Sequence, residues 1–186
     1  MIYLKAFEAI LPSKVINHLD VGTGERFRFD KIVSSERLLC NDIDFSLKTI
    51  QLPCFFGNAL LLSEFLKEKY FDLITCFDVI EHLKKEDGYK LIKKLENLSN
   101  DIIIFFTPLG EIAIGQSKIQ YHVHLSGWLP EDFTKLDYKC WVFPNFHKQY
   151  GYGAFFAIKS KRTLLNKKSL NGIDEIFDGE YWIENK

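Results

Sequence analysis

Two acidic residues, Asp20 and Asp42, each stand at the end of an apolar run and are the first candidates for chemistry in this chain. Asp20 closes the first run and is followed by Gly22 and Gly24. Glycine has no Cβ, so it lets a backbone turn tightly and approach a ligand closely. An acid at the tip of the next strand accepts hydrogen bonds from ribose hydroxyls in dinucleotide-binding folds. The pattern predicts a nucleoside pocket built on these four residues.

A second group of chemically capable residues is Asp78, Glu81 and His82, whose spacing places all three on one face of a helix. With His122 or His124, they have the donor atoms of a divalent metal site. The alternative is a capping box, in which Asp78 caps a helix and Glu81 reaches back to its backbone. We favour the capping box and assign no metal to the sequence.

Histidine is the usual general base near neutral pH, and the chain contains five histidines. We select His82 and His124 as catalytic candidates, because they border the end of the predicted sheet where ligands bind. His122 and His147 lie in neighbouring segments and are not excluded. His18 falls early in the first strand, so we assign it a structural role.

The predicted elements alternate between strands and helices, which is typical of a doubly wound α/β fold with a mostly parallel sheet. The segment 101–106 is apolar throughout and predicts a strand that is buried on both faces. Ser63 is the expected cap of a helix that runs to Lys69. Trp128 is expected to anchor the helix that opens at Pro130. The remaining predicted strands are 15–21, 37–41, 55–56, 73–77, 141–143 and 154–158, and the remaining predicted helices are 25–33, 46–50 and a segment around 91–98.

The last two predicted strands, 141–143 and 154–158, should pair as an antiparallel hairpin, because the segment between them is too short for a helical crossover. We assign residues 1–162 to one domain and residues 163–186 to a C-terminal tail that is docked or partly ordered.

Length and composition favour one globular domain, because the chain has 186 residues of which 47% are hydrophobic. Lys plus Arg total 24 and Asp plus Glu total 25, so nothing in the net charge favours nucleic acid or an anionic membrane. No apolar segment is long enough to span a bilayer. The four cysteines include no C-x-x-C pair, which favours reduced thiols and a cytoplasmic location.

Four motifs in order resemble those of class I S-adenosylmethionine-dependent methyltransferases, especially the small-molecule and ubiquinone-biosynthesis types. They are the glycine turn at 19–24, the acidic strand tip at 41–44, the Gly-Asn-Ala turn at 57–59 and the strand motif at 71–83. The likeness covers roughly residues 15–160. It implies a seven-stranded, mostly parallel Rossmann-like sheet with a C-terminal antiparallel hairpin, and S-adenosyl-L-methionine as the cofactor.

The resemblance assigns the cofactor's parts to particular residues. Asp20 is expected near the ammonium group, Asp42 at the ribose and Ile43 on one face of the adenine. Two positions depart from the family pattern, because Arg26 replaces a frequent third glycine and Asn58 replaces an aspartate. The complete predicted cofactor site is Asp20, Gly22, Gly24, Asp42, Ile43, Asn58, Ala59 and Phe77.

The expected function is methyl transfer to an oxygen or nitrogen atom of an acceptor that is a small molecule, a glycan-type compound or a lipid-linked compound. A homodimer is a further expectation. One alternative is a non-catalytic protein of the same fold that binds S-adenosylmethionine or a partner. A nicotinamide-dependent oxidoreductase is a further alternative, opposed by the missing G-x-G-x-x-G spacing and the terminal hairpin.

Overall fold

A computed structural model of the chain describes residues 14–24, 33–44, 53–111, 123–147, 152–161 and 181–183. Two of the predicted helices, 25–33 and 46–50, fall largely or wholly outside these residues. Within the described part of the chain, no helix reaches the length and hydrophobicity that crossing a lipid bilayer requires.

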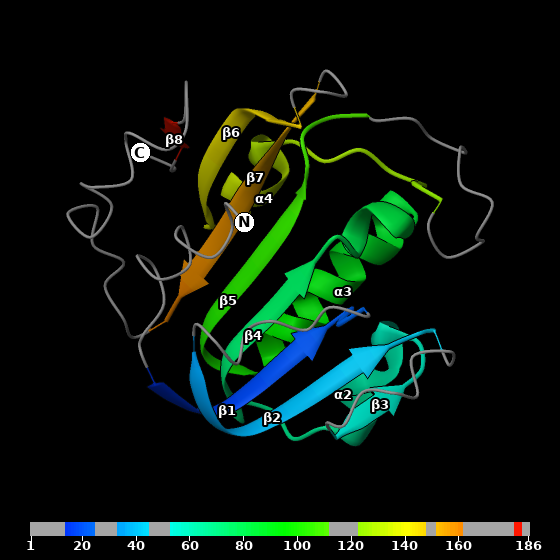
Figure 1. Ribbon diagram of the computed structural model, residues 1–186, viewed down its shortest axis with the longest axis vertical. Coiled ribbons are helices and arrows are strands. Elements are labelled where there is room, and N and C mark those ends of the chain that lie inside the picture. Colours follow the sequence, from blue (N-terminus) through cyan, green and yellow to red (C-terminus); the bar gives the residue numbers. More distant parts are fainter. Residues whose placement is uncertain are drawn as a thin grey trace.

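One mixed sheet organises the molecule, with its strands in the order β3-β2-β1-β4-β5-β7-β6-β8. The first five strands in this order are parallel, and β7, β6 and β8 are antiparallel to their neighbours. Figure 1 shows the arrowheads of β1, β2 and β4 pointing to the same side. The strands are β1 (Lys14–Val21), β2 (Ser34–Asp42), β3 (Cys54–Phe56), β4 (Phe71–Phe77), β5 (Ser99–Pro108), β6 (Lys139–His147), β7 (Tyr152–Ser160) and β8 (Tyr181–Ile183).

This topology confirms the predicted α/β sheet with a C-terminal antiparallel hairpin. Strands β6 and β7 form the hairpin and pair along most of their length, with Trp141 opposite Phe156. The tail contributes an eighth strand, because β8 pairs with β6 at the edge of the sheet. Its three residues carry too little periodicity to be recognised as a strand from the sequence.

Short helices follow the parallel strands: η3 (Ala59–Leu61), α2 (Leu62–Phe65), η4 (Ile80–His82), α3 (Lys85–Leu98) and α4 (Pro130–Thr134). The helix predicted to start at Ser63 begins earlier and ends at Phe65. Asn58 is the reason, because its side-chain oxygen accepts a hydrogen bond from the Leu60 N–H at 2.9 Å and caps the first turn.

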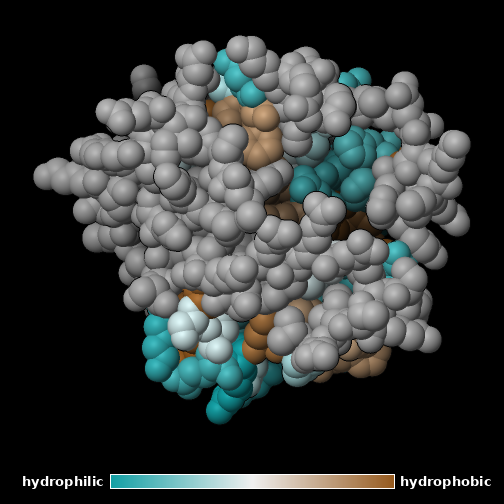
Figure 2. All heavy atoms as spheres, viewed as in Figure 1, coloured by the Kyte–Doolittle hydropathy of each residue, from teal (hydrophilic) through white to brown (hydrophobic). Residues whose placement is uncertain are grey.

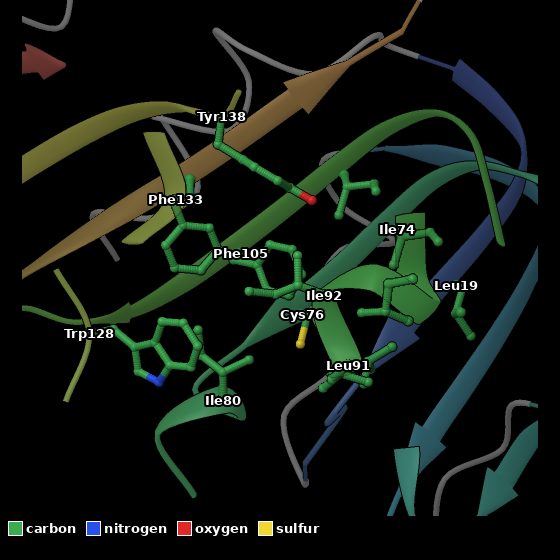
Figure 3. Packing of buried hydrophobic residues seen from close by; sticks show 14 of the residues in the cluster. Leu19, Ile74, Cys76, Ile80, Leu91, Ile92, Phe105, Trp128, Phe133 and Tyr138 are labelled. Atoms are coloured by element: carbon green, nitrogen blue, oxygen red, sulfur yellow. The ribbon is translucent and has the colours of Figure 1, made fainter. Parts of the chain in front are cut away.

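Buried side chains cover both faces of the sheet, as the continuous apolar run in β5 predicts. Ile103 and Phe105 face a cluster shared with α3 and α4, whereas Ile104 and Phe106 face the opposite cluster. Figure 3 shows the first cluster, in which strand residues meet side chains of the helices. Its labelled members are Leu19, Ile74, Cys76, Ile80, Leu91, Ile92, Phe105, Trp128, Phe133 and Tyr138.

Trp128 is fully buried between α3 and α4, in agreement with its expected role as a packing anchor. Its ring lies 5.5 Å from that of Phe133 and 5.2 Å from that of Tyr89, measured between centroids. The Lys85 ammonium lies 3.9 Å from the centre of the indole and 2.5 Å from an Asp132 carboxylate oxygen. These contacts attach the segment before α4 to the first turn of α3.

The close approach of α3 to Trp128 requires a glycine at position 88. A Cβ added to Gly88 would lie 2.3 Å from Cζ2 of the Trp128 ring. Gly→Ala normally stabilises a helix interior by up to about 1 kcal/mol. Here we expect Gly88→Ala to destabilise the protein by about 1–3 kcal/mol through overpacking, as measured by urea denaturation. Glu86→Ala, an exposed change on the same helix, is the control, and a gain in stability for Gly88→Ala would contradict this packing.

Candidate functional site

The carboxyl ends of the parallel strands bring the predicted acids to one edge of the sheet. Asp20 lies near the end of β1, opposite Thr75 of β4, and Asp42 is the last residue of β2. Asp78 follows β4 directly, and its backbone N–H donates to the Phe106 carbonyl of β5 at 2.9 Å. Parallel packing alone therefore gathers these acids, which lie far apart in the sequence.

The glycine turn after β1 is fastened to the end of β2. The Gly22 and Thr23 N–H groups donate to the Asn41 carbonyl at 2.8 and 3.1 Å. Both glycines have a positive φ, 74° at Gly22 and 62° at Gly24, which residues with a Cβ adopt only at a cost. A Cβ at Gly22 would lie 2.1 Å from Cγ2 of Val79, whereas none of the residues that the structure describes has an atom within 4 Å of one at Gly24. The turn is therefore packed at Gly22 against the segment that follows β4.

Asp42 holds this turn through its side chain. One carboxylate oxygen accepts from the Gly24 N–H at 2.7 Å, and the other accepts from the Asp44 N–H at 2.9 Å. Each oxygen keeps a second lone pair, so a ribose hydroxyl can bind without displacing either bond. The next residue, Ile43, is 39% exposed and offers an apolar surface beside the carboxylate.

Asp20 is only 2% exposed and accepts a 2.6 Å hydrogen bond from the Thr75 hydroxyl. The Thr75 oxygen lies 2.9 Å from Nε2 of His18. Because the Thr75 proton points to the carboxylate, His18 must donate from Nε2, which fixes its tautomer. Burial lowers the pKa of His18 to about 3, so the ring is neutral. Burial also raises the pKa of Asp20 to about 6, although the Thr75 bond opposes the shift.

The motifs do not reveal Asn41, Thr75 and Thr107 as partners of the site, and the structure gives each a defined contact. The Asn41 amide donates to the carbonyls of Phe55 and Gly57 at 2.9 and 3.0 Å and holds the end of β3 against β2. Their common signal is a buried polar residue near the carboxyl end of an apolar strand. Such a pattern can identify the polar residue from the sequence. It cannot identify the hydrogen-bond partner, because the partner depends on the order of the strands in the sheet.

The segment after β4 differs from its prediction, because the expected capping box does not form. Val79 occupies the N-cap position of η4 without a side-chain cap bond, and Asp78 has a φ of 51°. This left-handed conformation turns the chain out of β4 and removes Asp78 from the capping position. Glu81 is 3% exposed and accepts a 3.1 Å hydrogen bond from the Thr107 hydroxyl.

Burial governs the ionisation of both carboxyl groups in this segment. Desolvation raises the pKa of Asp78 to about 7. Part of the Asp78 residue is exposed to solvent. Protein atoms surround its carboxyl group, so desolvation still raises the pKa of this group. Desolvation raises the pKa of Glu81 well above its usual range, and the nearby Asp78 carboxylate adds to the effect.

Residues 123–126 lie along η4 and bring the two selected histidines together. The Leu125 and Ser126 N–H groups both donate to the Glu81 carbonyl, at 2.7 and 3.1 Å. Nδ1 of His82 lies 3.2 Å from the Val123 carbonyl oxygen. The rings of His82 and His124 are consequently 4.9 Å apart between centroids. One ligand atom from each of Glu81, His82 and His124 fits within a 4.8 Å cluster.

The remaining predicted site residues occupy different surroundings. Asn58 is exposed and caps η3, while Ala59 starts that helix and is partly buried. The Phe77 ring lies 6.0 Å from that of Phe106 and 5.9 Å from that of Phe156, as part of the cluster on the other face of the sheet. Contact between Phe77 and a cofactor stays a prediction. Arg26 and His122 lie outside the described residues.

Figure 2 shows a group of hydrophilic side chains at the upper right of the molecule, with hydrophobic atoms visible at the bottom of an adjoining hollow. Figure 1 places the upper end of α3 in this region. In the part of the chain that the structure describes, the ion pairs made by lysine side chains do not involve Asp20, Asp42, Asp78 or Glu81. A cationic ligand bound beside these acids would favour their ionised form, which burial opposes.

Comparison with known proteins connects this arrangement to one fold. No family model matches the sequence, and no curated protein matches it significantly. An S-adenosylmethionine-dependent methyltransferase from Archaeoglobus fulgidus superposes with a TM-score of 0.60 at 16% identity, over 78% of this chain and 86% of that one. The N-methyltransferase NodS from Bradyrhizobium japonicum gives a TM-score of 0.61 at 14% identity, over 87% and 94% of the two chains.

A third similar structure is the phosphoethanolamine-type N-methyltransferase 2 of Haemonchus contortus, in complex with phosphomonomethylethanolamine and S-adenosylhomocysteine. It gives a TM-score of 0.60 at 12% identity, over 84% of this chain and 51% of that one. The chain therefore has the Rossmann-like fold of class I S-adenosylmethionine-dependent methyltransferases, as its motifs predict.

The raised pKa of Asp20 predicts a pH-dependent stability. Its pKa is about 6 in the folded protein, against 3.8 for an unperturbed side chain. The folded state therefore holds this proton more tightly, and the resulting stability is complete below pH 3.8 and is lost as the pH rises through 6. We expect the free energy of unfolding of wild type, relative to Asp20→Asn, to fall by about 1–3 kcal/mol between about pH 4 and pH 7.

Urea denaturation across this pH range measures the difference. Glu86→Gln removes an exposed acid of α3 and serves as the control, which should keep the pH dependence of wild type. If Asp20→Asn also kept it, the carboxyl group would not be desolvated as the structure describes.

Proposed function

We propose that this protein transfers a methyl group from S-adenosylmethionine to an oxygen or nitrogen atom of an acceptor. The observation that carries the proposal is the attachment of the Gly22–Gly24 turn to the Asp42 carboxylate at the carboxyl edge of the sheet. Ligands of open α/β sheets bind at this edge. The similar solved structures support the same choice, since two of them are N-methyltransferases and one of these holds S-adenosylhomocysteine.

The described residues fit the nucleoside half of that cofactor. Asp42 would accept from the ribose hydroxyls through its remaining lone pairs, and Ile43 would pack against adenine. Asn58 still has an amide group to offer to the adenine edge, because only its oxygen caps η3. Among the described residues, Gly24 leaves room for the ligand, since none of them has an atom within 4 Å of a Cβ placed there.

The charge of the site fits the methionine half of S-adenosylmethionine. S-adenosylmethionine supplies a methyl group on a positively charged sulfur together with an amino-acid tail, so its reactive half carries cationic groups. Burial is the main cause of the raised pKa of Asp20, and the Asp42 carboxylate adds to it, so the Asp42 charge acts on Asp20. Their shared field would attract the sulfonium and ammonium groups. Asp20 would act on the ammonium from beneath the turn, directly or through water.

The acceptor would lie toward η4, where His82 and His124 are the candidate catalytic residues. A neutral His82 that donates from Nδ1 to the Val123 carbonyl carries its lone pair on Nε2. Either imidazole is a suitable base for an acceptor that loses a proton during transfer. We further propose that residues 1–162 form the catalytic domain, and that the acceptor is a small molecule or a glycan-type compound.

Asp42→Asn tests the cofactor site with a change of nearly equal shape. One oxygen is retained, so one of the two structural hydrogen bonds survives while the charge and one acceptor are lost. We expect S-adenosylmethionine to bind about 5- to 150-fold more weakly, the equivalent of about 1–3 kcal/mol, as measured by isothermal titration calorimetry. Glu36→Gln, at the opposite end of β2, should leave the affinity unchanged.

The wild-type protein is also titrated with NADH. Wild-type protein that bound NADH, or that bound neither ligand, would overturn the proposed cofactor.

Transfer itself is tested with methyl-labelled S-adenosylmethionine and fractionated cell extract. Wild type should label an acceptor, and Asp42→Asn should label less of it at cofactor concentrations below the dissociation constant of the variant. Tight cofactor binding without any labelled product would support the non-catalytic alternative instead.

A further inference from the structure

We infer that Thr75 and His18 are positioning residues, which hold the Asp20 carboxylate in the orientation that binds the ammonium group of the cofactor. The inference rests on the proposed function, because the ammonium group belongs to S-adenosylmethionine. The Thr75 hydroxyl donates to Oδ1 of Asp20 at 2.6 Å, and its oxygen lies 2.9 Å from Nε2 of His18. His18 therefore reaches the site through Thr75, which goes beyond the structural role that the sequence suggests for it.

This chain of contacts lies on the face of the sheet that points away from α3. Side chains of a strand alternate between the two faces. Leu19 and Ile74, both labelled in Figure 3, belong to the cluster that packs against α3. The alternate residues His18, Asp20 and Thr75 therefore point to the other face. His18 and Thr75 are fully buried, and Asp20 is nearly so.

Stability alone does not account for polar side chains at these positions. Buried polar groups are costly even when they are paired, and apolar residues of similar size would fill the space without that cost. Apolar residues are also typical of strands that are buried on both faces. The chain instead leads to Asp20, which precedes Gly22 in the turn that shapes the proposed cofactor pocket.

When Asp20 is ionised, every proton of the chain points toward its carboxylate. The Ser35 hydroxyl lies 3.3 Å from Nδ1 of His18 and donates to that nitrogen. His18 donates from Nε2 to Thr75, and Thr75 donates to Asp20. A hydroxyl can both donate and accept, and a neutral imidazole has one donor and one acceptor. His18 thus occupies the acceptor side of Thr75 and directs its proton to Asp20.

Protonation of Asp20 on Oδ1 would reverse the direction of the chain. The carboxyl group would donate to Thr75, Thr75 would donate to Nε2 of His18, and His18 would donate from Nδ1 to Ser35. The imidazole would change its tautomer and stay neutral, because burial lowers its pKa to about 3. The tautomer of His18 therefore indicates the charge of Asp20, whose proton is exchanged with solvent.

The other titratable groups that interact with Asp20, among the residues that the structure describes, come from the neighbouring strands. Burial raises the pKa of Asp20 to about 6 and the Asp42 carboxylate adds to the rise, whereas the Thr75 hydroxyl lowers the pKa. Burial also raises the pKa of three nearby thiols, which therefore stay neutral in acidic and neutral solution. They are Cys40, Cys54 and Cys76.

The pH dependence of cofactor affinity tests the positioning role, because an ammonium group binds the ionised carboxylate. We expect calorimetry to show tighter binding of S-adenosylmethionine as the pH rises from about 5 to about 7.5, with a midpoint near the pKa of Asp20. Thr75→Val keeps the size of the side chain and removes the hydroxyl. It should raise the midpoint by about one pH unit and weaken binding at low pH about tenfold. Thr75→Ser should restore the midpoint.

His18 is tested in the same titration. His18→Leu removes the donor to Thr75 and should raise the midpoint in the same direction as Thr75→Val. His18→Gln should largely restore it, because the amide group can both donate and accept. Circular dichroism must first show that each variant folds, since these side chains are buried.

Three controls separate a positioning role from general damage to the site. Thr134→Val changes a buried threonine of α4 and should keep the wild-type midpoint, whereas Asp20→Asn should lose it. 5′-Methylthioadenosine has the nucleoside without the amino-acid tail, so its binding should not share the midpoint. A loss of affinity in Thr75→Val that is equal at every pH would overturn the positioning role.

Nitrogen NMR of the His18 ring tests the chain in wild-type protein without any ligand. We expect the proton on Nε2 near pH 7.5 and on Nδ1 near pH 5, with the signals assigned by their loss in His18→Gln. S-adenosylmethionine added near pH 5 should return the proton to Nε2, because its ammonium group favours the ionised carboxylate. An identical tautomer at both pH values would overturn the reversible chain.

The two measurements separate this inference from the proposed function. S-adenosylmethionine that binds Thr75→Val with the wild-type midpoint would overturn the positioning role and leave methyl transfer in place. A His18 tautomer that changes with pH in a protein that binds no S-adenosylmethionine would overturn the proposed cofactor, and its ammonium group as the ligand of Asp20, but not the chain.

Discussion

Desolvation of carboxyl groups is the constraint on which this edge of the sheet depends. Asp20, Asp78 and Glu81 all have a raised pKa, and burial is the largest cause in each case. The charges of all three acids add to the burial that raises the pKa of the Cys76 thiol, near the end of β4. The three acids are therefore close enough to influence one buried group. Burying acids together is unfavourable for folding, and it prepares the edge for ligands that bring positive charge.

Neutral donors from neighbouring strands hold these acids. Thr75 of β4 donates to Asp20 of β1, and Thr107 of β5 donates to Glu81, which follows β4. The Gly24 N–H donates to Asp42 in the same manner. Neutral donors orient a carboxylate without cancelling its charge. An arginine or lysine side chain would orient the carboxylate and also neutralise it. These contacts therefore give the acids no counter-charge, and a cationic ligand could supply one.

Patterns that act locally were predictable from the sequence, and contacts between distant strands were not. Apolar runs and short gaps defined the parallel sheet and its hairpin, and they placed Asp42 at the end of β2. The role of Asp42 at the ribose stays a prediction. The bond from Thr75 to Asp20 depends on β1 lying beside β4, which periodicity does not determine. The capping box failed because spacing alone cannot show that Asp78 has a left-handed backbone.

Val79 connects the two halves of the candidate site. Its Cγ2 occupies the space that a Cβ of Gly22 would need, and it precedes η4, which carries Glu81 and His82. The glycine turn and the segment after β4 are therefore packed directly against each other. Any residue larger than glycine at position 22 would have to displace the Val79 side chain. The same glycine thus shapes the proposed cofactor pocket and fixes its distance from the histidines.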